Sequence, residues 1–205
     1  MFSERSLFLA SLFTDPVYFL QFFIIIVVSI TLHELGHGAA AISQGDNTPN
    51  ESGHMTLNPV VHMGMPSLVV LALVGIAWGE MPVQPSRFKD GSTGRMMVSA
   101  AGPMTNFAIA AVCIALIHLL LSQSVGTVSL NFLRLAAIVN VGLGIFNLLP
   151  IPPLDGFTVF SELFPGMKPI ANHPAAPAIL FLLFFTGGLS AVWIGAAFIV
   201  DRLIF

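Results

Sequence analysis

Four stretches of the chain run for about 20 residues or more with at most two charged side chains each. An α-helix needs about 20 predominantly apolar residues to cross the hydrocarbon core of a bilayer. Only 7 basic and 10 acidic residues occur among 205, so the charged fraction is 8%, about a third of the roughly 25% usual in soluble domains. A soluble domain of this size could not bury so much apolar surface. We therefore expect membrane helices over Val17–Ser43, Met96–Leu121, Leu130–Leu149 and Ala178–Ile204.

The fold class expected from this pattern is an all-α integral membrane protein. It should be a bundle of four to six transmembrane helices with a short re-entrant or β-like loop region. A fifth apolar stretch, Ser67–Trp78, has 12 residues and would measure only about 18 Å as a helix. That is short of the roughly 30 Å core. The last of the four predicted spans contains the pair Gly187-Gly188, where its helix is expected to be weakest.

The connections are expected to be irregular. Residues 44–66 are polar and rich in Gly, Pro and Asn, with one short β-compatible stretch at His54–Leu57. Residues 79–94 contain an extended piece around Pro82 and Pro85. With Arg87, Lys89 and Arg95, they form the most basic part of the chain. Residues 150–177 form a connection with seven prolines. The first apolar run could also be a signal peptide, but no small-residue cleavage site follows it, so we expect it to be retained.

The charge and cysteine content exclude two classes of function. Seven scattered basic residues with a net charge of −3 cannot neutralise a phosphate backbone, so nucleic acid is not expected as a partner. The single cysteine, Cys113, can form neither an intramolecular disulfide nor a cysteine-based metal site. A metal would have to bind through histidines and carboxylates.

The first predicted helix contains the sequence HELGH, from His33 to His37. In a helix, histidines at positions i and i+4 share a face and can bind one zinc ion, while the glutamate between them acts as the general base. With this composition, the pattern would arise by accident with a chance of about 0.004. Two interface histidines on an amphipathic helix are the alternative. Ionisable groups inside a span are costly, however, and are usually retained for function.

A catalytic zinc needs a third protein ligand, commonly a carboxylate. Most acidic residues lie in loops or near the ends of the chain, whereas Asp155 follows directly on a predicted span, within the sequence PIPPLDG. Its position alone fits a metal ligand and a helix-capping or turn residue equally well.

HELGH in a membrane helix together with NLLPIPPLDG resembles the site-2 protease family of intramembrane zinc metalloproteases, whose signatures are HExxH and NxxPxPxLDG. The stretches at 53–62 (GHMTLNPVVH) and 101–106 (AGPMTN) are similar to compact bacterial and archaeal members. The likeness covers most of residues 17–165.

This resemblance implies one zinc ion per chain, bound by His33, His37 and Asp155. It also implies that Glu34 is the general base and that Asn147 lies near the bound peptide. The alternative for Asn147 is a helix-packing amide.

The resemblance further implies a single membrane-embedded metalloprotease domain over residues 1–205. Its catalytic core should cover about 17–165, with an accessory C-terminal helix over about 178–204. The sequence contains neither the PDZ insertion nor the cystathionine-β-synthase domain found in other members.

The location of the site follows from the need for the zinc ligands to meet. The end of the first helix and the end of the helix over 130–149 must lie on one face of the membrane, so Ser67–Trp78 should not cross it. The basic loop 79–95 then places the active site on the cytoplasmic side, in a membrane that we expect to be the prokaryotic inner membrane. The ten residues from His33 to Ser43 put the zinc about 15 Å below that surface.

A helical substrate must unwind before hydrolysis, and an extended edge can hold it by strand addition. Residues 80–85, which include Pro82 and Val83, are the candidate edge; a plain proline-stiffened loop is the alternative. The other polar residues of interest are expected to make loop, interfacial or interhelical hydrogen bonds. These residues are His54, His62, His118, His173, Asn106 and Asn140.

The expected partners are a transmembrane protein substrate and the lipid bilayer, with room for a regulatory membrane protein; the oligomeric state is open. Two other functions are alternatives. A membrane metal transporter could use the same His and Asp cluster, but transporters commonly show a path of ligands and an internal repeat, and the sequence shows neither. A scaffold that binds without cutting would not need Glu34 beside two histidines.

Overall fold

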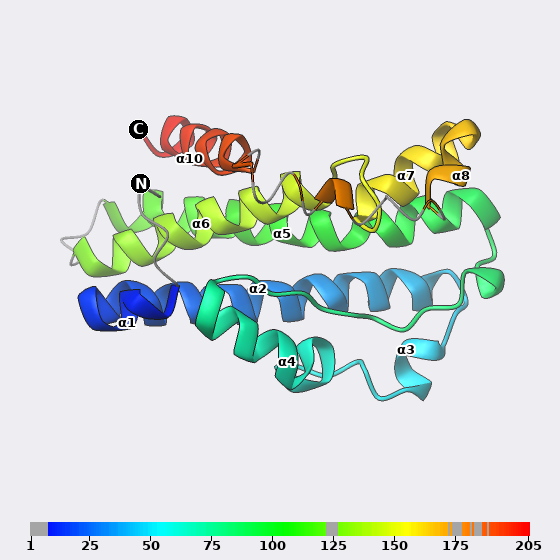
Figure 1. The fold of residues 1–205 in the computed structure, drawn as a ribbon, viewed down its shortest axis with the longest axis horizontal. Helices are drawn as coiled ribbons and strands as arrows, with labels where there is room; N and C mark the ends of the chain where they lie inside the picture. Colours follow the sequence, from blue (N-terminus) through cyan, green and yellow to red (C-terminus); the bar gives the residue numbers. More distant parts are fainter. Residues whose placement is uncertain are drawn as a thin grey trace.

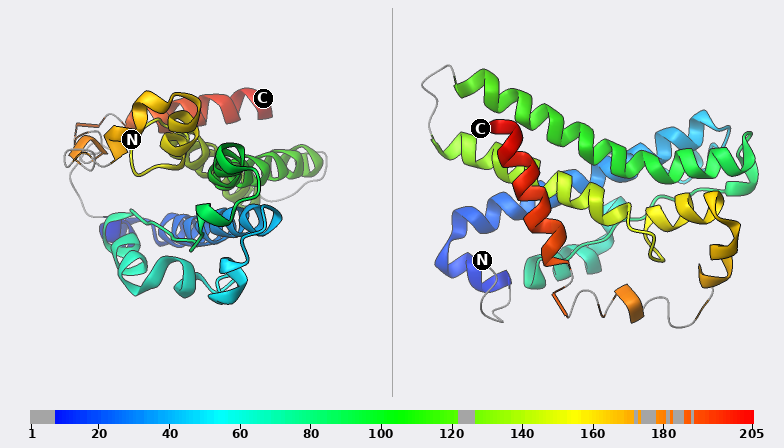
Figure 2. Two further views of the ribbon diagram at one scale, coloured as in Figure 1. Left: turned by 90° about the vertical axis from the view of Figure 1, so that its right-hand side faces the viewer. Right: turned by 90° about the horizontal axis from the view of Figure 1, so that it is seen from above.

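The computed structural model describes residues 8–121, 127–171, 173, 178–180, 182, 186–187 and 189–205. Its helices stack in layers (Figures 1 and 2): α5 and α6 run side by side, α2 lies along α5, and α4 packs on the other side of α2. The larger elements are α2 (Pro16–Ser43), α4 (Pro59–Val74), α5 (Gly91–Leu121), α6 (Thr127–Asn147), α7 (Asp155–Leu163) and α10 (Ser190–Ile204). The short ones are η1 (Phe8–Ala10), α1 (Ser11–Thr14), α3 (Thr48–Glu51), η2 (Pro85–Arg87), η3 (Pro165–Met167) and α8 (Lys168–Ala171).

The first predicted span is confirmed as α2. Its first residue is Pro16, whose fixed φ and missing N–H suit the first turn. The Asp15 side chain caps the helix by accepting a hydrogen bond from the amide of Tyr18 (3.0 Å). The 28 residues of α2 measure about 42 Å, more than the hydrocarbon core requires.

Three described helices are long and apolar enough to cross a membrane: α2, α5 and α6. They include three of the four predicted spans. The fourth, over 178–204, was expected to be one continuous helix, and this is wrong. Thr186 and Gly187 form a turn, Gly187 has a φ of +76°, and the helix that follows begins at Ser190 and has 15 residues. The weak point expected at Gly187-Gly188 falls at this turn, although Gly188 itself lies outside the described residues.

The connection over 44–66 was expected to contain no helix, and this expectation is also wrong. It holds α3 and the start of α4, and the described residues contain no strand, including at His54–Leu57. Helix α4 begins eight residues before the predicted Ser67 because the Asn58 side chain caps it, accepting from the amide of Val60 (3.1 Å).

Helix α4 is short and bent. It has 16 residues, about 24 Å, and is not among the candidate spans. Gly64 interrupts the helical geometry with a φ of +65°, and Pro66 follows it. A φ in this range is readily available only to glycine. That the segment does not cross the membrane remains a prediction.

The proline-rich connection over 150–177 contains the amphipathic helix α7, which the sequence pattern did not predict. Helix α7 packs against α5 (Figure 1). Helix α10 crosses obliquely over α6 when the molecule is seen from above (Figure 2). Helix α5 thus contacts α2, α6 and α7, and it brings the sequence motifs of all three together.

Candidate metal centre

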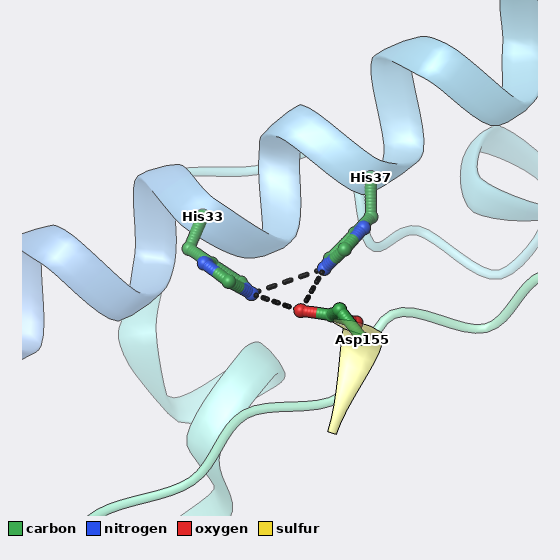
Figure 3. A group of neighbouring side chains, drawn as sticks. All are labelled: His33, His37 and Asp155. Carbon is green, nitrogen blue, oxygen red and sulfur yellow. Dashed lines mark hydrogen bonds and ion pairs between the residues drawn. The ribbon is translucent and has the colours of Figure 1, made fainter. Parts of the chain in front are cut away.

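Three side chains from two distant parts of the chain meet in the bundle: His33, His37 and Asp155 (Figure 3). The two histidines are one helical turn apart on the same face of α2. Their Nε2 atoms are 3.0 Å apart. The Oδ2 atom of Asp155 lies 3.1 Å from Nε2 of His33 and 3.3 Å from Nε2 of His37. Both histidines are buried.

These separations fit a zinc ion. Tetrahedral ligands about 2.0 Å from a metal lie about 3.3 Å from one another, which is close to the 3.0 to 3.3 Å found between the three ligand atoms. Two imidazole nitrogens and one carboxylate oxygen are also a donor set typical of catalytic zinc. Among the residues that the structure describes, this is the one such group of three His, Cys, Asp or Glu side chains.

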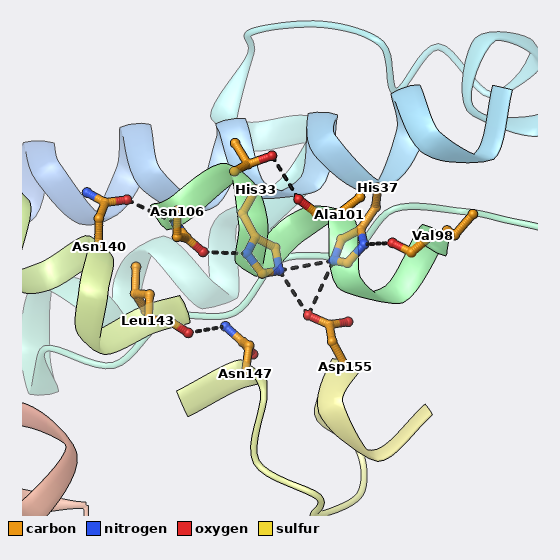
Figure 4. Close-up of polar contacts among 10 residues, drawn as sticks. His33, His37, Val98, Ala101, Asn106, Asn140, Leu143, Asn147 and Asp155 are labelled. Carbon is orange, nitrogen blue, oxygen red and sulfur yellow. Dashed lines mark hydrogen bonds and ion pairs between the residues drawn. The ribbon is translucent and has the colours of Figure 1, made fainter. Parts of the chain in front are cut away.

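The far nitrogens of both imidazoles are engaged, and this orients the rings. Nδ1 of His37 lies 2.7 Å from the carbonyl oxygen of Val98, and Nδ1 of His33 lies 2.6 Å from Oδ1 of Asn106 (Figure 4). A carbonyl oxygen only accepts, so each Nδ1 carries the proton. In the neutral ring, Nε2 then offers its lone pair to a metal.

The hydrogen bond to His33 belongs to a chain across three helices. Asn106 on α5 donates from Nδ2 to Oδ1 of Asn140 on α6 (3.0 Å; Figure 4). Asn140 in turn donates to the hydroxyl of Ser29 on α2 (2.9 Å). The expected interhelical hydrogen bonds of the two asparagines are thus confirmed. The role of Asn106 behind His33 was missed; a polar side chain in a predicted span was the only signal for it.

Asp155 is the first residue of α7 and does not cap it. The turn before it folds tightly onto the end of α6: a Cβ atom at Gly156 would collide with the backbone of Leu148. The Oδ2 atom of Asp155 faces the Nε2 atoms of both histidines, and as a metal ligand the carboxyl would be in its charged form.

Glu34 is the second residue of the HELGH sequence and is 6% exposed. No hydrogen bond or ion pair joins its carboxylate to any of the described residues. Its Oε1 atom lies against the backbone of Gly79, where a Cβ would come within 2.5 Å. A buried carboxylate with no partner, next to a metal ligand, is free to accept a proton.

The extended segment over 80–84 runs beside α2. The amide of Glu80 donates to the carbonyl of His62 (2.9 Å), and the amide of Gln84 donates to Oδ2 of Asp46 (2.6 Å). The amides of Met81 and Val83 have no hydrogen-bond partner among the described residues. Amides alternate between the two edges of an extended chain, so those of Met81 and Val83 face the edge away from these contacts.

Asn147 ends α6, is partly buried, and donates from Nδ2 to the carbonyl of Leu143 within its own helix (3.1 Å). Figure 4 shows it below the histidine pair, on the side from which Asp155 approaches. The structure thus gives it no interhelical hydrogen bond among the described residues.

The remaining histidines lie outside the cluster. His62 contacts the carbonyl of Thr56 (2.7 Å), and His54 contacts Ser52 (3.0 Å to Oγ). His118 contacts the carbonyl of Leu203 (2.8 Å). Both His54 and His62 thus contact neighbouring residues, although His62 lies on α4 and not in a loop.

Comparisons with known proteins agree with this centre. The model of peptidase family M50 matches residues 21–130 and 116–189. The proposed zinc metalloprotease YwhC of Bacillus subtilis is 32% identical over 82% of this chain and 81% of its own length. The proposed zinc metalloprotease Rip2 of Mycobacterium tuberculosis is 33% identical over 83% of this chain and 68% of its own.

A solved structure of the site-2 protease from Methanocaldococcus jannaschii aligns over 97% of this chain and 84% of that one. The identity is 19% and the TM-score is 0.48.

Proposed function

The chain belongs to peptidase family M50, and from this membership and the geometry of the centre we propose that His33, His37 and Asp155 hold one zinc ion. The protein is a zinc metalloprotease of the site-2 protease type, which confirms the resemblance found in the sequence. Its substrates are proposed to be membrane proteins, cut within or next to a transmembrane segment.

The observation that carries this proposal is the convergence of three ligand atoms inside a bundle of apolar helices. The ligand side of the histidine pair is lined by Gly102 of α5, where a Cβ would collide with both Nε2 atoms. The missing side chain leaves room for a metal next to the rings.

Glu34 is proposed as the general base. A zinc ion held by His33, His37 and Asp155 would supply the Lewis acid that activates a water molecule and polarises the scissile carbonyl. Glu34 takes a proton from the attacking water and gives it to the leaving amine as the C–N bond breaks. Its carboxylate suits this role because it is buried beside His33 and has no partner among the described residues.

The candidate substrate site is the edge of the segment over 80–84. With the amides of Glu80 and Gln84 engaged, and with Pro82 lacking an N–H, Met81 and Val83 are left to pair with an unwound substrate strand. The side chain of Val83 packs on the cluster of Ala41, Phe88 and Val98, which holds this edge against α2. Asn147 is proposed to lie near the bound peptide.

A matched pair of variants tests this edge. Val83→Pro removes the amide N–H together with the valine packing, whereas Val83→Ala removes only the packing. We expect Val83→Pro to raise the KM for a single-span substrate by about two- to tenfold over Val83→Ala, the worth of one hydrogen bond. Equal KM values for the two variants would mean that the segment is a plain proline-stiffened loop and does not bind the substrate strand.

The site is proposed to face the cytoplasm of a prokaryotic cell, in its inner membrane, as one domain over residues 1–205 with its core at about 17–165. The basic residues of 79–95 support this orientation, and the relatives named above come from bacteria. Lys89→Cys would be labelled by an impermeant maleimide in inverted vesicles and not in spheroplasts. The opposite labelling would reverse the orientation.

Metal transport, one of the two alternative functions, has no support from the family match. The described residues hold one compact ligand cluster and no path of ligands. Two assays on the purified protein decide between the functions: cleavage of a single-span substrate in detergent, and zinc uptake into proteoliposomes. We expect cleavage that a chelator abolishes. Zinc uptake without cleavage would replace the protease by a transporter.

A further inference from the structure

Asp46 is a charged residue that the proposed chemistry does not use, yet it is fully buried, at 0% exposure. It lies between the end of α2 and the start of α3. Its Oδ1 atom accepts hydrogen bonds from the amide (3.1 Å) and the hydroxyl (2.5 Å) of Thr48. Its Oδ2 atom accepts the bond from the amide of Gln84, at 2.6 Å. Arg87 lies 3.8 Å from Oδ1.

The two oxygens serve different purposes. The bonds to Thr48 are local and shape the turn into α3, which a neutral asparagine oxygen could also do. The bond to Gln84 spans 38 residues of sequence and needs the second acceptor oxygen. A buried carboxylate is costly unless its oxygens are satisfied, so the contact with Gln84, together with the ion pair to Arg87, explains why an acidic residue stands here.

That contact ties the extended segment to the helix that carries the metal ligands. Asp46 follows α2 closely, and α2 holds His33 and His37. The other end of the segment is fixed to α4, because the amide of Glu80 donates to the carbonyl of His62 (2.9 Å). Just before the segment, the hydroxyl of Ser67 on α4 also bonds the amide (2.9 Å) and the carbonyl (2.7 Å) of Trp78. The free edge at Met81 and Val83 lies between these two attachments.

We propose that Asp46 is a positioning residue that fixes the register of the bound substrate strand relative to the metal centre. The inference rests on the proposed function. By holding the amide of Gln84, Asp46 turns Met81 and Val83 toward the substrate and sets their distance along α2 from His37. The residue thereby determines which peptide bond reaches the metal centre.

The test is cleavage-site mapping with Asp46→Asn. The amide group of asparagine keeps one acceptor oxygen for Thr48 but presents a donor to the amide of Gln84, which repels it. We expect the KM for a single-span substrate to rise by about two- to tenfold. The products, sized by mass spectrometry, should shift from one main cut to cuts at neighbouring bonds, while zinc content stays at the parent value.

Thr48→Val is the matched control, because it disturbs the other oxygen of the same carboxylate and leaves the bond to Gln84 intact. It should cut at the parent position. If Asp46→Asn does not fold, Gln84→Pro removes the same hydrogen bond from the other side and should give the same spread of cuts.

Parent-like cleavage sites and KM in the folded variant would overturn the proposal, and so would loss of zinc, since Asp46 would then act on the metal centre itself. Substrate binding is also measured for Glu34→Gln and for the double variant Glu34→Gln with Asp46→Asn. This measurement separates failure of the positioning role from failure of the proposed function. If the parent binds zinc and cuts nothing, the protease assignment fails. If binding to the Glu34→Gln protein still weakens with Asp46→Asn, Asp46 holds the bound strand even so, and only its role in selecting the cleaved bond falls with the protease assignment.

Discussion

The Nδ1 atom of His33 lies 2.6 Å from Oδ1 of Asn106, a side chain with 0% exposure. This contact fixes the ring so that Nε2 faces the metal position. Asn106→Ala should therefore lower zinc affinity by about 10- to 100-fold, measured by competition with a chelating dye. Asn106→Asp keeps the acceptor and should hold zinc better than Asn106→Ala. Equal affinities for the parent and Asn106→Ala would show that the ring needs no such support.

Gly102 lies directly against the ligand atoms, because a Cβ there would collide with Nε2 of both His33 and His37. Gly102→Ala should push the rings apart and lower kcat/KM by about 100-fold, the cost of a displacement of about 1 Å at a reacting centre. Gly166→Ala, where a Cβ would meet nothing within 4 Å, is the control. Full activity in Gly102→Ala would mean that the two rings can move to admit the added methyl group without loss of catalysis.

How much of this site could be predicted from the sequence depends on how far apart in the chain the interacting residues lie. HELGH was readable because its spacing alone places both histidines on one helical face. Asp155 was ambiguous from its position, since its meeting with His33 spans 122 residues and depends on how α7 packs on α5. The resemblance to a known family, not the local pattern, singled it out.

The start of α4 and the whole of α7 were not predicted, because of the residues that surround them. Prolines and glycines in 44–66 and 150–177 suggested loops, but Pro59 stands at the first position of α4, where proline is favourable. The capping residue Asn58 was the available signal for the start of α4.

The role of Asn106 behind His33 could not be predicted, because its partner His33 lies on another helix.

Glu162 on α7 holds that helix to the start of α5, and this contact depends on pH. Its carboxylate accepts from Arg95 (2.6 Å), Ser92 (2.7 Å) and Lys168 (2.9 Å). Hydrogen bonding by Arg95, against an opposing effect of burial, lowers the pKa of Glu162 from 4.5 to about 2.

A lowered pKa stabilises the folded protein above pH 4.5, and this contribution is lost as the pH falls from 4.5 toward 2. Glu162→Gln should therefore melt below the parent at pH 7, with a gap that narrows as the pH falls through this window. Melting curves in detergent at several pH values measure the gap. A gap of constant size would mean that the Glu162 charge does not contribute.

Arg134 on α6 and Asp201 on α10 form a two-pronged ion pair, with both distances 2.7 Å. Both side chains are partly exposed. Asp201→Asn leaves the arginine charge without its partner and should lower the melting temperature by about 2–4 °C, the effect of roughly 1 kcal/mol in a chain of this size. The double change Arg134→Gln with Asp201→Asn should recover part of the loss. If the melting temperature does not recover in the double variant, the unpaired charge of Arg134 is not the cause of the loss.

The most direct test of the metal centre measures zinc content and turnover together in the parent, Glu34→Gln and Asp155→Ala. The account predicts about one zinc ion per chain in the parent. Glu34→Gln should keep the metal and lose cleavage, and Asp155→Ala should lose zinc affinity. Cleavage by Glu34→Gln at the parent rate would contradict the role of Glu34, and parent-like zinc affinity in Asp155→Ala would contradict the ligand set.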